Sequence, residues 1–144
     1  MSANGINGSE LNGRTEEFLY HVKRTITDFA DDKSGATRTT DILGTFTSLP
    51  AAKAAARAAL ASEGYIKDDF ESFEVKDETN FEDWKHADGV LVFAKAPRGQ
   101  EFEVRLDTKP NSSNFKGNSD GEVEGVLHYG EFLYLLNLNS RSMS

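Results

Sequence analysis

One alanine-rich segment, residues 48–64, limits what this chain can fold into more than any other feature of its sequence. Ser48 is a typical N-cap, Pro50 fits a first helical turn and Gly64 favours a helix stop, so a helix is predicted over about residues 49–63. The side chains that recur at helical spacing on one face are Ala52, Ala55, Ala56, Ala59 and Leu60. A face this small packs closely on a sheet but buries little area, at roughly 25 cal/mol per Å². Strands and their aromatic residues are therefore expected to supply most of the core.

The residues before the helix predict a β-hairpin. Segments 18–29 and 37–46 alternate in polarity on either side of the turn residues 31–35. The residues expected to share one face of the first strand are Phe18, Tyr20, Val22 and Ile26. The residues expected to share one face of the second strand are Thr40, Ile42, Gly44 and Phe46.

The residues after the helix predict further strands. A helical turn over 68–73 leads into a short strand that ends at residue 76, and segments 90–96 and 101–107 flank the turn signal Pro97-Arg98-Gly99. A polar loop over 109–121 is long enough to be functional or mobile, and a last strand is expected over about 123–138. The pattern predicts an α+β fold, in which a mainly antiparallel sheet of five to six strands carries the 49–63 helix on one face.

Length and composition predict one domain with polar ends. Residues 1–16 are polar and aperiodic and are expected to be a disordered leader, 17–139 the folded domain, and 140–144 a frayed tail. The net charge of −8 makes the chain a poor partner for nucleic-acid phosphates or anionic membranes. Because no apolar run approaches roughly 20 residues and the chain has no cysteine, a cytoplasmic location is expected, with neither nucleic acid nor membrane as a partner.

Five residues are the candidates for chemistry: His21, His86, His128, Glu101 and Arg105. His21 and His128 lie in the first and last predicted strands, and with Glu131 they would form a metal site if those strands lie together. The favoured interpretation is that both histidines face solvent, so neither a metal nor a cofactor is expected. His86, close to Asp88, has the spacing of an oriented general base, although an Asp-Gly pair before a strand is ordinary turn chemistry.

Two charged features have a surface interpretation and a binding interpretation. Lys53 and Arg57 are four residues apart beside the alanine face, which indicates an exposed helix flank or, less commonly, an anion contact. Residues 68–83 carry a run of carboxylates that is typical of a solvated surface and that would also suit a basic partner.

A combination of segments resembles a group of small fungal proteins of uncharacterised activity. These segments are Ile42-Leu43-Gly44-Thr45-Phe46-Thr47-Ser48-Leu49, the alanine helix that follows, Glu63-Gly64-Tyr65, and Trp84 with Asp88-Gly89-Val90. The resemblance covers about residues 18–136. It implies a fungal intracellular setting and assigns no catalytic residue.

The sequence favours a non-enzymatic binding or self-associating domain, because its candidate residues form no recognisable catalytic constellation. Phe132 to Leu136 is apolar on both faces, so either the segment from Phe70 to Trp84 or a second copy must cover that strand, and a C2 homodimer is expected. The alternative is a small-ligand binding protein or a lyase-like enzyme, with its cavity between sheet and helix.

Overall fold

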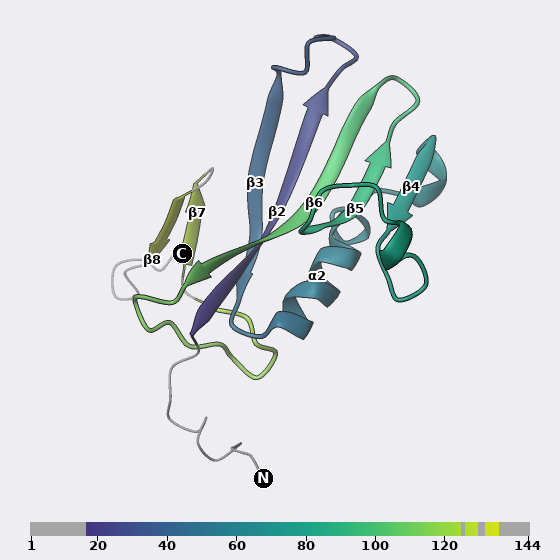
Figure 1. Cartoon of the computed structure of the whole chain (residues 1–144). Coiled ribbons are helices and arrows are strands. Elements are labelled where there is room, and N and C mark those ends of the chain that lie inside the picture. Colours follow the sequence, from purple (N-terminus) through teal and green to yellow (C-terminus); the bar gives the residue numbers. More distant parts are fainter. Residues whose placement is uncertain (1–16, 125, 130–131, 136–144) are drawn as a thin grey trace.

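A five-stranded antiparallel sheet carries one α-helix on one face, in a computed structural model that describes residues 17–124, 126–129 and 132–135 (Figure 1). The strands follow the order β3-β2-β6-β5-β4. Their bounds are β2 Phe18–Asp28, β3 Arg38–Phe46, β4 Ser72–Val75, β5 Val90–Lys95 and β6 Gln100–Pro110. The predicted α+β fold is confirmed. The predicted leader 1–16 and tail 140–144 lie outside the described residues.

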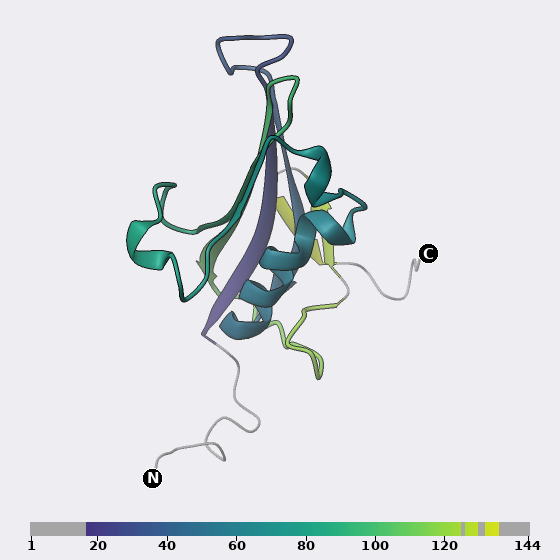
Figure 2. The ribbon, with the colours of Figure 1, turned by 90° about the vertical axis from the view of Figure 1, so that its right-hand side faces the viewer.

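Two layers stand on opposite sides of this sheet. Helix α2, Leu49–Ser62, packs on one side, and the segment between β4 and β5 lies on the other (Figure 2). That segment contains the short 3-10 helix η2, Phe81–Asp83. The helical turn predicted over 68–73 is only partly present: a second 3-10 helix, η1, covers Lys67–Asp69, whereas residues 72 and 73 already belong to β4. We call the two sides the helix face and the open face.

Helix α2 begins and ends as its sequence predicts. The Ser48 hydroxyl accepts a hydrogen bond from the Ala51 amide at 3.3 Å, and Gly64, just after the helix, has a φ of +96° that favours glycine. Four residues of the predicted inner face are buried: Ala52, Ala56, Ala59 and Leu60. They pack against Val22, Val92, Phe102 and Val104, which confirms that the strands provide the large core side chains.

One face assignment is wrong because β3 contains a bulge. Val22 pairs with Gly44, but the next residue of β2, Lys23, pairs with Ile42, so Leu43 is an extra residue in β3. An extra residue moves every side chain beyond it to the other side of the sheet. Gly44 and Phe46 therefore belong to the helix face, whereas Ile42 and Thr40 belong to the open face.

Strand β6 is longer than predicted and is the main partner of β2. The two strands pair from Phe18↔Pro110 to Asp28↔Gln100, so β6 extends three residues beyond the predicted end at 107. The expected alternation is confirmed in β6, where Phe102 and Val104 are buried in the core and Arg105 is exposed.

The single last strand predicted over 123–138 is wrong. The chain forms a separate hairpin of β7, Val126–Tyr129, and β8, Phe132–Leu135, with Tyr129 paired to Phe132. The intervening pair Gly130-Glu131 has the Gly-X composition that two-residue hairpin loops favour. The hairpin lies beside the β3 edge of the sheet, at the opposite end from β4 (Figure 1).

Candidate binding clefts

Most of the sequence-predicted site residues lie on the open face. His21, Glu101 and Arg105 alternate in register with core residues of β2 and β6, which places them opposite α2. His86 stacks on Phe93 of the same face. The side chain of His128, and Glu131, lie outside the described residues, so the predicted metal site is represented by His21 alone.

His86 is held by aromatic and carboxylate contacts. Its ring centre lies 4.2 Å from that of Phe93 at an angle of 19°, and 4.9 Å from that of Trp84 in a T-shaped arrangement. Its Nε2 atom lies 2.9 Å from a carboxylate oxygen of Glu74 on β4. Glu74, and not the predicted Asp88, is thus the carboxylate that orients His86. These contacts fasten the segment between β4 and β5 to the sheet.

His21 is buried, with 5% of its surface exposed, which contradicts the favoured interpretation of a solvent-facing strand histidine. Its Nδ1 atom lies 2.9 Å from the Thr45 hydroxyl on β3. Within 17–124 and the described parts of the hairpin, no cluster of three His, Cys, Asp or Glu side chains is placed to hold a metal ion.

A polar groove of about 610 Å³ runs over the open face around Arg105. Its cations and carboxylates oppose one another: Lys23 Nζ donates to Asp107 at 2.8 Å, and Arg105 lies 3.8 Å from Glu103. Burial raises the pKa of Asp107, but the hydrogen bond and charge of Lys23 outweigh it, so the pKa is lowered overall. Glu101 precedes Glu103 by two residues on β6, and its register partner is Lys95 on β5. The groove therefore contains balanced ion pairs.

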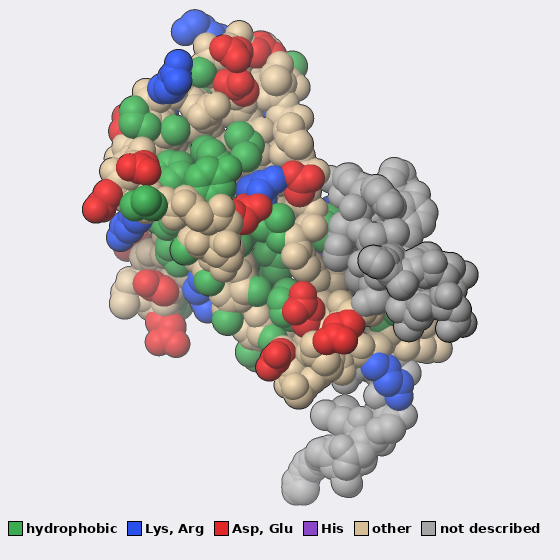
Figure 3. All heavy atoms as spheres, turned by 180° about the vertical axis from the view of Figure 1, so that it is seen from behind, with side chains coloured by type: hydrophobic (Ala, Val, Ile, Leu, Met, Phe, Trp, Pro, Cys, Tyr) green, Lys and Arg blue, Asp and Glu red, His purple; other side chains and the backbone are tan. Residues whose placement is uncertain are grey.

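The helix face, seen in Figure 3, has two further hollows because one narrow helix does not cover five strands. The first hollow, which we call the acidic groove, lies between α2 and β3 and has a volume of about 450 Å³. Its floor is apolar and includes Val22, Phe46 and Ala59. The carboxylates of Glu63 and Glu122 lie at its rim.

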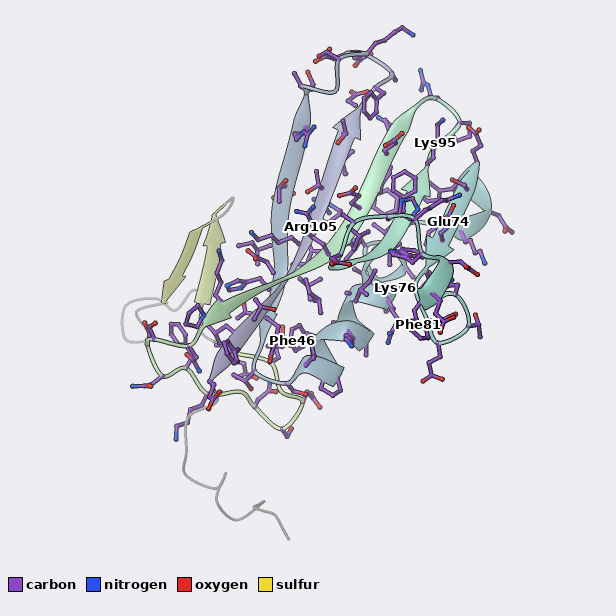
Figure 4. All side chains as sticks on the ribbon, viewed as in Figure 1. Phe46, Glu74, Lys76, Phe81, Lys95 and Arg105 are labelled. Atoms are coloured by element: carbon purple, nitrogen blue, oxygen red, sulfur yellow. The ribbon has the colours of Figure 1, made fainter. Side chains whose placement is uncertain are left out.

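The second hollow, which we call the basic cleft, lies on the other side of α2, where the first residues of the segment between β4 and β5 meet the helix, and has a volume of about 380 Å³. Leu91 of β5 and Leu106 of β6 form its floor. The residues that form its walls are Lys53, Arg57, Lys76, Asp77, Glu78, Phe81 and Gly89. Lys76 and Phe81 lie on one side of α2 and Phe46 on the other (Figure 4), so the two hollows flank the helix.

The cations of the basic cleft are not neutralised by salt bridges. Lys53, Arg57 and Lys76 make no salt bridge to any residue of the described part of the chain. The Arg57 Nε atom donates to the Lys76 carbonyl at 3.0 Å, which ties α2 to the end of β4. Phe81 at the rim is 55% exposed, which is unusual for a phenylalanine.

Asp77, one of the two carboxylates in the cleft wall, is hydrogen-bonded within its local turn. The Asp77 carboxylate accepts from the Thr79 hydroxyl at 2.6 Å and from the Thr79 amide at 2.8 Å. These hydrogen bonds lower the pKa of Asp77, with a smaller contribution from the charge of Arg57. Asp77 therefore stays negatively charged, and the three cations of the cleft exceed its two carboxylates by one charge.

Sequence reasoning gave Lys53 and Arg57 an anion contact only as the less common interpretation, and it missed the other members of the cleft. The four-residue spacing of the two cations was the only local signal. Lys76, Phe81 and Leu106 are far from them in sequence, and no periodic pattern connects them.

The comparisons with known proteins found no matching family model, no matching curated protein and no matching solved structure. The resemblance to small fungal proteins stays a prediction. No helix within the described residues has the length and apolarity needed to cross a membrane.

Proposed function

We propose that this chain is a non-enzymatic binding domain that binds its ligand on the helix face of the sheet. The observation that carries this proposal is the incomplete cover that α2 provides, which leaves two hollows of about 450 and 380 Å³ with apolar floors. Small-molecule sites have volumes of about 300–1,000 Å³ and are concave and mostly apolar.

The arrangement of the candidate catalytic residues supports binding over catalysis. A lyase-like enzyme with its cavity between sheet and helix needs acid or base groups in that cavity. None of the described candidates, His21, His86, Glu101 and Arg105, lines either hollow of the helix face.

An NMR titration tests the proposal. ¹⁵N-labelled full-length protein is titrated with anionic, cationic and neutral organic compounds of about 15–20 heavy atoms, a size that suits these volumes. We expect the perturbed amides to cluster in α2 and in the strands beneath it. Perturbations confined to the open face around His86 and Arg105 would refute the proposed function.

Self-association is a second candidate, favoured by one observation. Phe73 belongs to β4 and contacts Phe70 just before it, whereas β8 lies at the other end of the sheet (Figure 1). The segment from Phe70 to Trp84 is therefore not available to cover the last strand, which leaves a second copy of the chain as the proposed cover. For either function we propose a cytoplasmic setting, which the absence of cysteine supports.

A further inference from the structure

We propose that the basic cleft binds a small amphipathic anion, an apolar body that carries one carboxylate, sulfonate or phosphate group. This inference rests on the proposed function and deepens it, because it selects one of the two hollows on the helix face and names the chemical class of its ligand.

The charges of the cleft select an anion. Lys53 and Arg57 come from α2 and Lys76 follows β4, so three cations from two elements meet in one hollow of a chain whose net charge is −8. None of these three cations makes a salt bridge to a described residue. The wall also carries the carboxylates of Asp77 and Glu78, so the three cations leave a formal charge of +1 at the cleft. An incoming anion would supply the missing counter-charge.

The floor and rim of the cleft select an apolar body. Leu91 is buried and Leu106 is half-buried beneath the cations, and Phe81 exposes 55% of its surface at the rim. A ligand with an apolar body would cover Phe81 and Leu106, which gains roughly 25 cal/mol per Å² of apolar surface removed from water. A bare inorganic anion would leave that surface exposed, so both parts of the ligand are needed.

The acidic groove provides an internal contrast on the same face. It has a similar volume and an apolar floor, but the charged residues of its lining are Glu63 and Glu122. Because Glu63 is paired with Arg24, the Glu122 carboxylate is the one that would repel an anion. The anion is therefore expected on one side of α2 only.

Two fluorescent probes with the same apolar body test the charge requirement. The anionic probe is 8-anilinonaphthalene-1-sulfonate and the neutral probe is N-phenyl-1-naphthylamine, and both are titrated against the full chain. The cleft variant is Lys53→Gln with Lys76→Gln. The control is Lys33→Gln with Lys95→Gln, which removes the same charge at positions outside the cleft. Thermal melts followed by circular dichroism establish that both variants are folded.

We expect one anionic probe to bind per chain and the cleft variant to weaken it about tenfold, the loss that one charge-assisted contact produces. The control variant should change its affinity by less than about twofold, and the neutral probe should bind both variants alike. Phe81→Ala should weaken both probes. Equal losses of the anionic probe in the cleft and control variants, or no loss in either, would overturn the proposal.

An NMR map of the bound anionic probe separates this proposal from the proposed function. Perturbed amides around Lys53, Leu91 and Leu106 support both. Perturbed amides around Val22 and Phe46 place the probe in the acidic groove, which overturns the cleft proposal and leaves the helix-face function standing. Perturbed amides on the open face overturn both.

Discussion

The guanidinium of Arg24, on β2, donates a hydrogen bond to the carboxylate of Glu63, the residue that follows the last turn of α2. A second nitrogen of the same group donates to Asp41 on β3. Burial opposes the charge of Arg24, but the hydrogen bond and charge of Glu63, together with the charge of Asp41, outweigh it and raise the pKa of Arg24. One side chain thus joins the end of the helix to two neighbouring strands.

Replacing Arg24 with lysine should lower the free energy of unfolding by about 1–2 kcal/mol, because one ammonium group does not reproduce the planar two-sided contact. Urea unfolding measures the change. The control is Arg98→Lys in the exposed turn before β6, which should be nearly neutral. A loss of the same size in the control would contradict the role of Arg24 as a joint.

Enlarging the inner face of α2 should be costly. Ala56 is fully buried and Ala54 is exposed. Ala56→Leu is expected to destabilise the protein by about 1–3 kcal/mol through overpacking, whereas Ala54→Leu should be nearly neutral. Equal midpoints for the two variants in urea unfolding would show that the helix does not pack as described.

Removing the carboxylate of Asp107 should reduce the loss of folding stability that occurs as the pH falls. Its pKa is lowered in the folded state, so its contribution is present above the unfolded pKa of about 3.9 and is lost as the pH falls through the folded pKa. Asp107→Asn should therefore cost about 1–3 kcal/mol at pH 7. The difference from the natural protein should shrink at pH 3 and below. Urea titrations at both pH values check this, with the exposed Asp69→Asn as the control.

Adding a single methyl group at Gly121 should disturb the start of α2. A Cβ atom there would lie 2.7 Å from the Ser48 Cβ, and the φ of +81° also favours glycine. Gly64 has a φ of +96°, but a Cβ atom at that position would meet no atom of the described residues within 4 Å. Gly64→Ala should thus cost only the roughly 1–2 kcal/mol of the left-handed conformation, and Gly121→Ala clearly more. Thermal melts measure the loss of stability in each variant. Equal losses would disprove the close packing of Gly121 against Ser48.

A C2 homodimer, if formed, should depend on the last strand. Light scattering at micromolar concentration measures the mass, and Leu133→Glu should convert a dimer to a monomer with an unchanged far-ultraviolet spectrum. Ser112→Glu in the 109–121 loop is the control. A natural protein that is monomeric throughout would refute self-association, and an unfolded Leu133→Glu variant would assign that residue to the core of one chain.

The fold was predictable wherever its signals are local. The caps of α2 and the alternation of Phe102 and Val104 in β6 depend on neighbouring residues, and both were identified correctly. The bulge at Leu43 was not predictable, because it depends on how β3 pairs with Val22 and Lys23, which is a tertiary property. The break between β7 and β8 had a signal in Gly130-Glu131, which the apolar character of the surrounding run outweighed.

The candidate site was less predictable than the fold. Charge and spacing on α2 offered an anion contact at Lys53 and Arg57 only beside the commoner interpretation of an exposed flank. The floor of the cleft comes from Leu91 and Leu106, on strands much later in the chain. Histidine chemistry made His21 and His86 candidates, but in the structure His21 contacts Thr45 and His86 contacts Glu74. A contact between distant segments leaves no pattern in a single sequence.

The position of β2 between β3 and β6 has a consequence for how the protein is made. β2 is the first described strand to leave the ribosome, and β6, its longest partner, is the last strand of the sheet to be synthesised. Until residue 110 has emerged, one edge of β2 has no strand to pair with and the surface beneath α2 lacks Phe102 and Val104. Nascent chains that stop short of β6 should therefore be recognised by chaperones and cleaved by proteases, and protection should appear abruptly once β6 is complete.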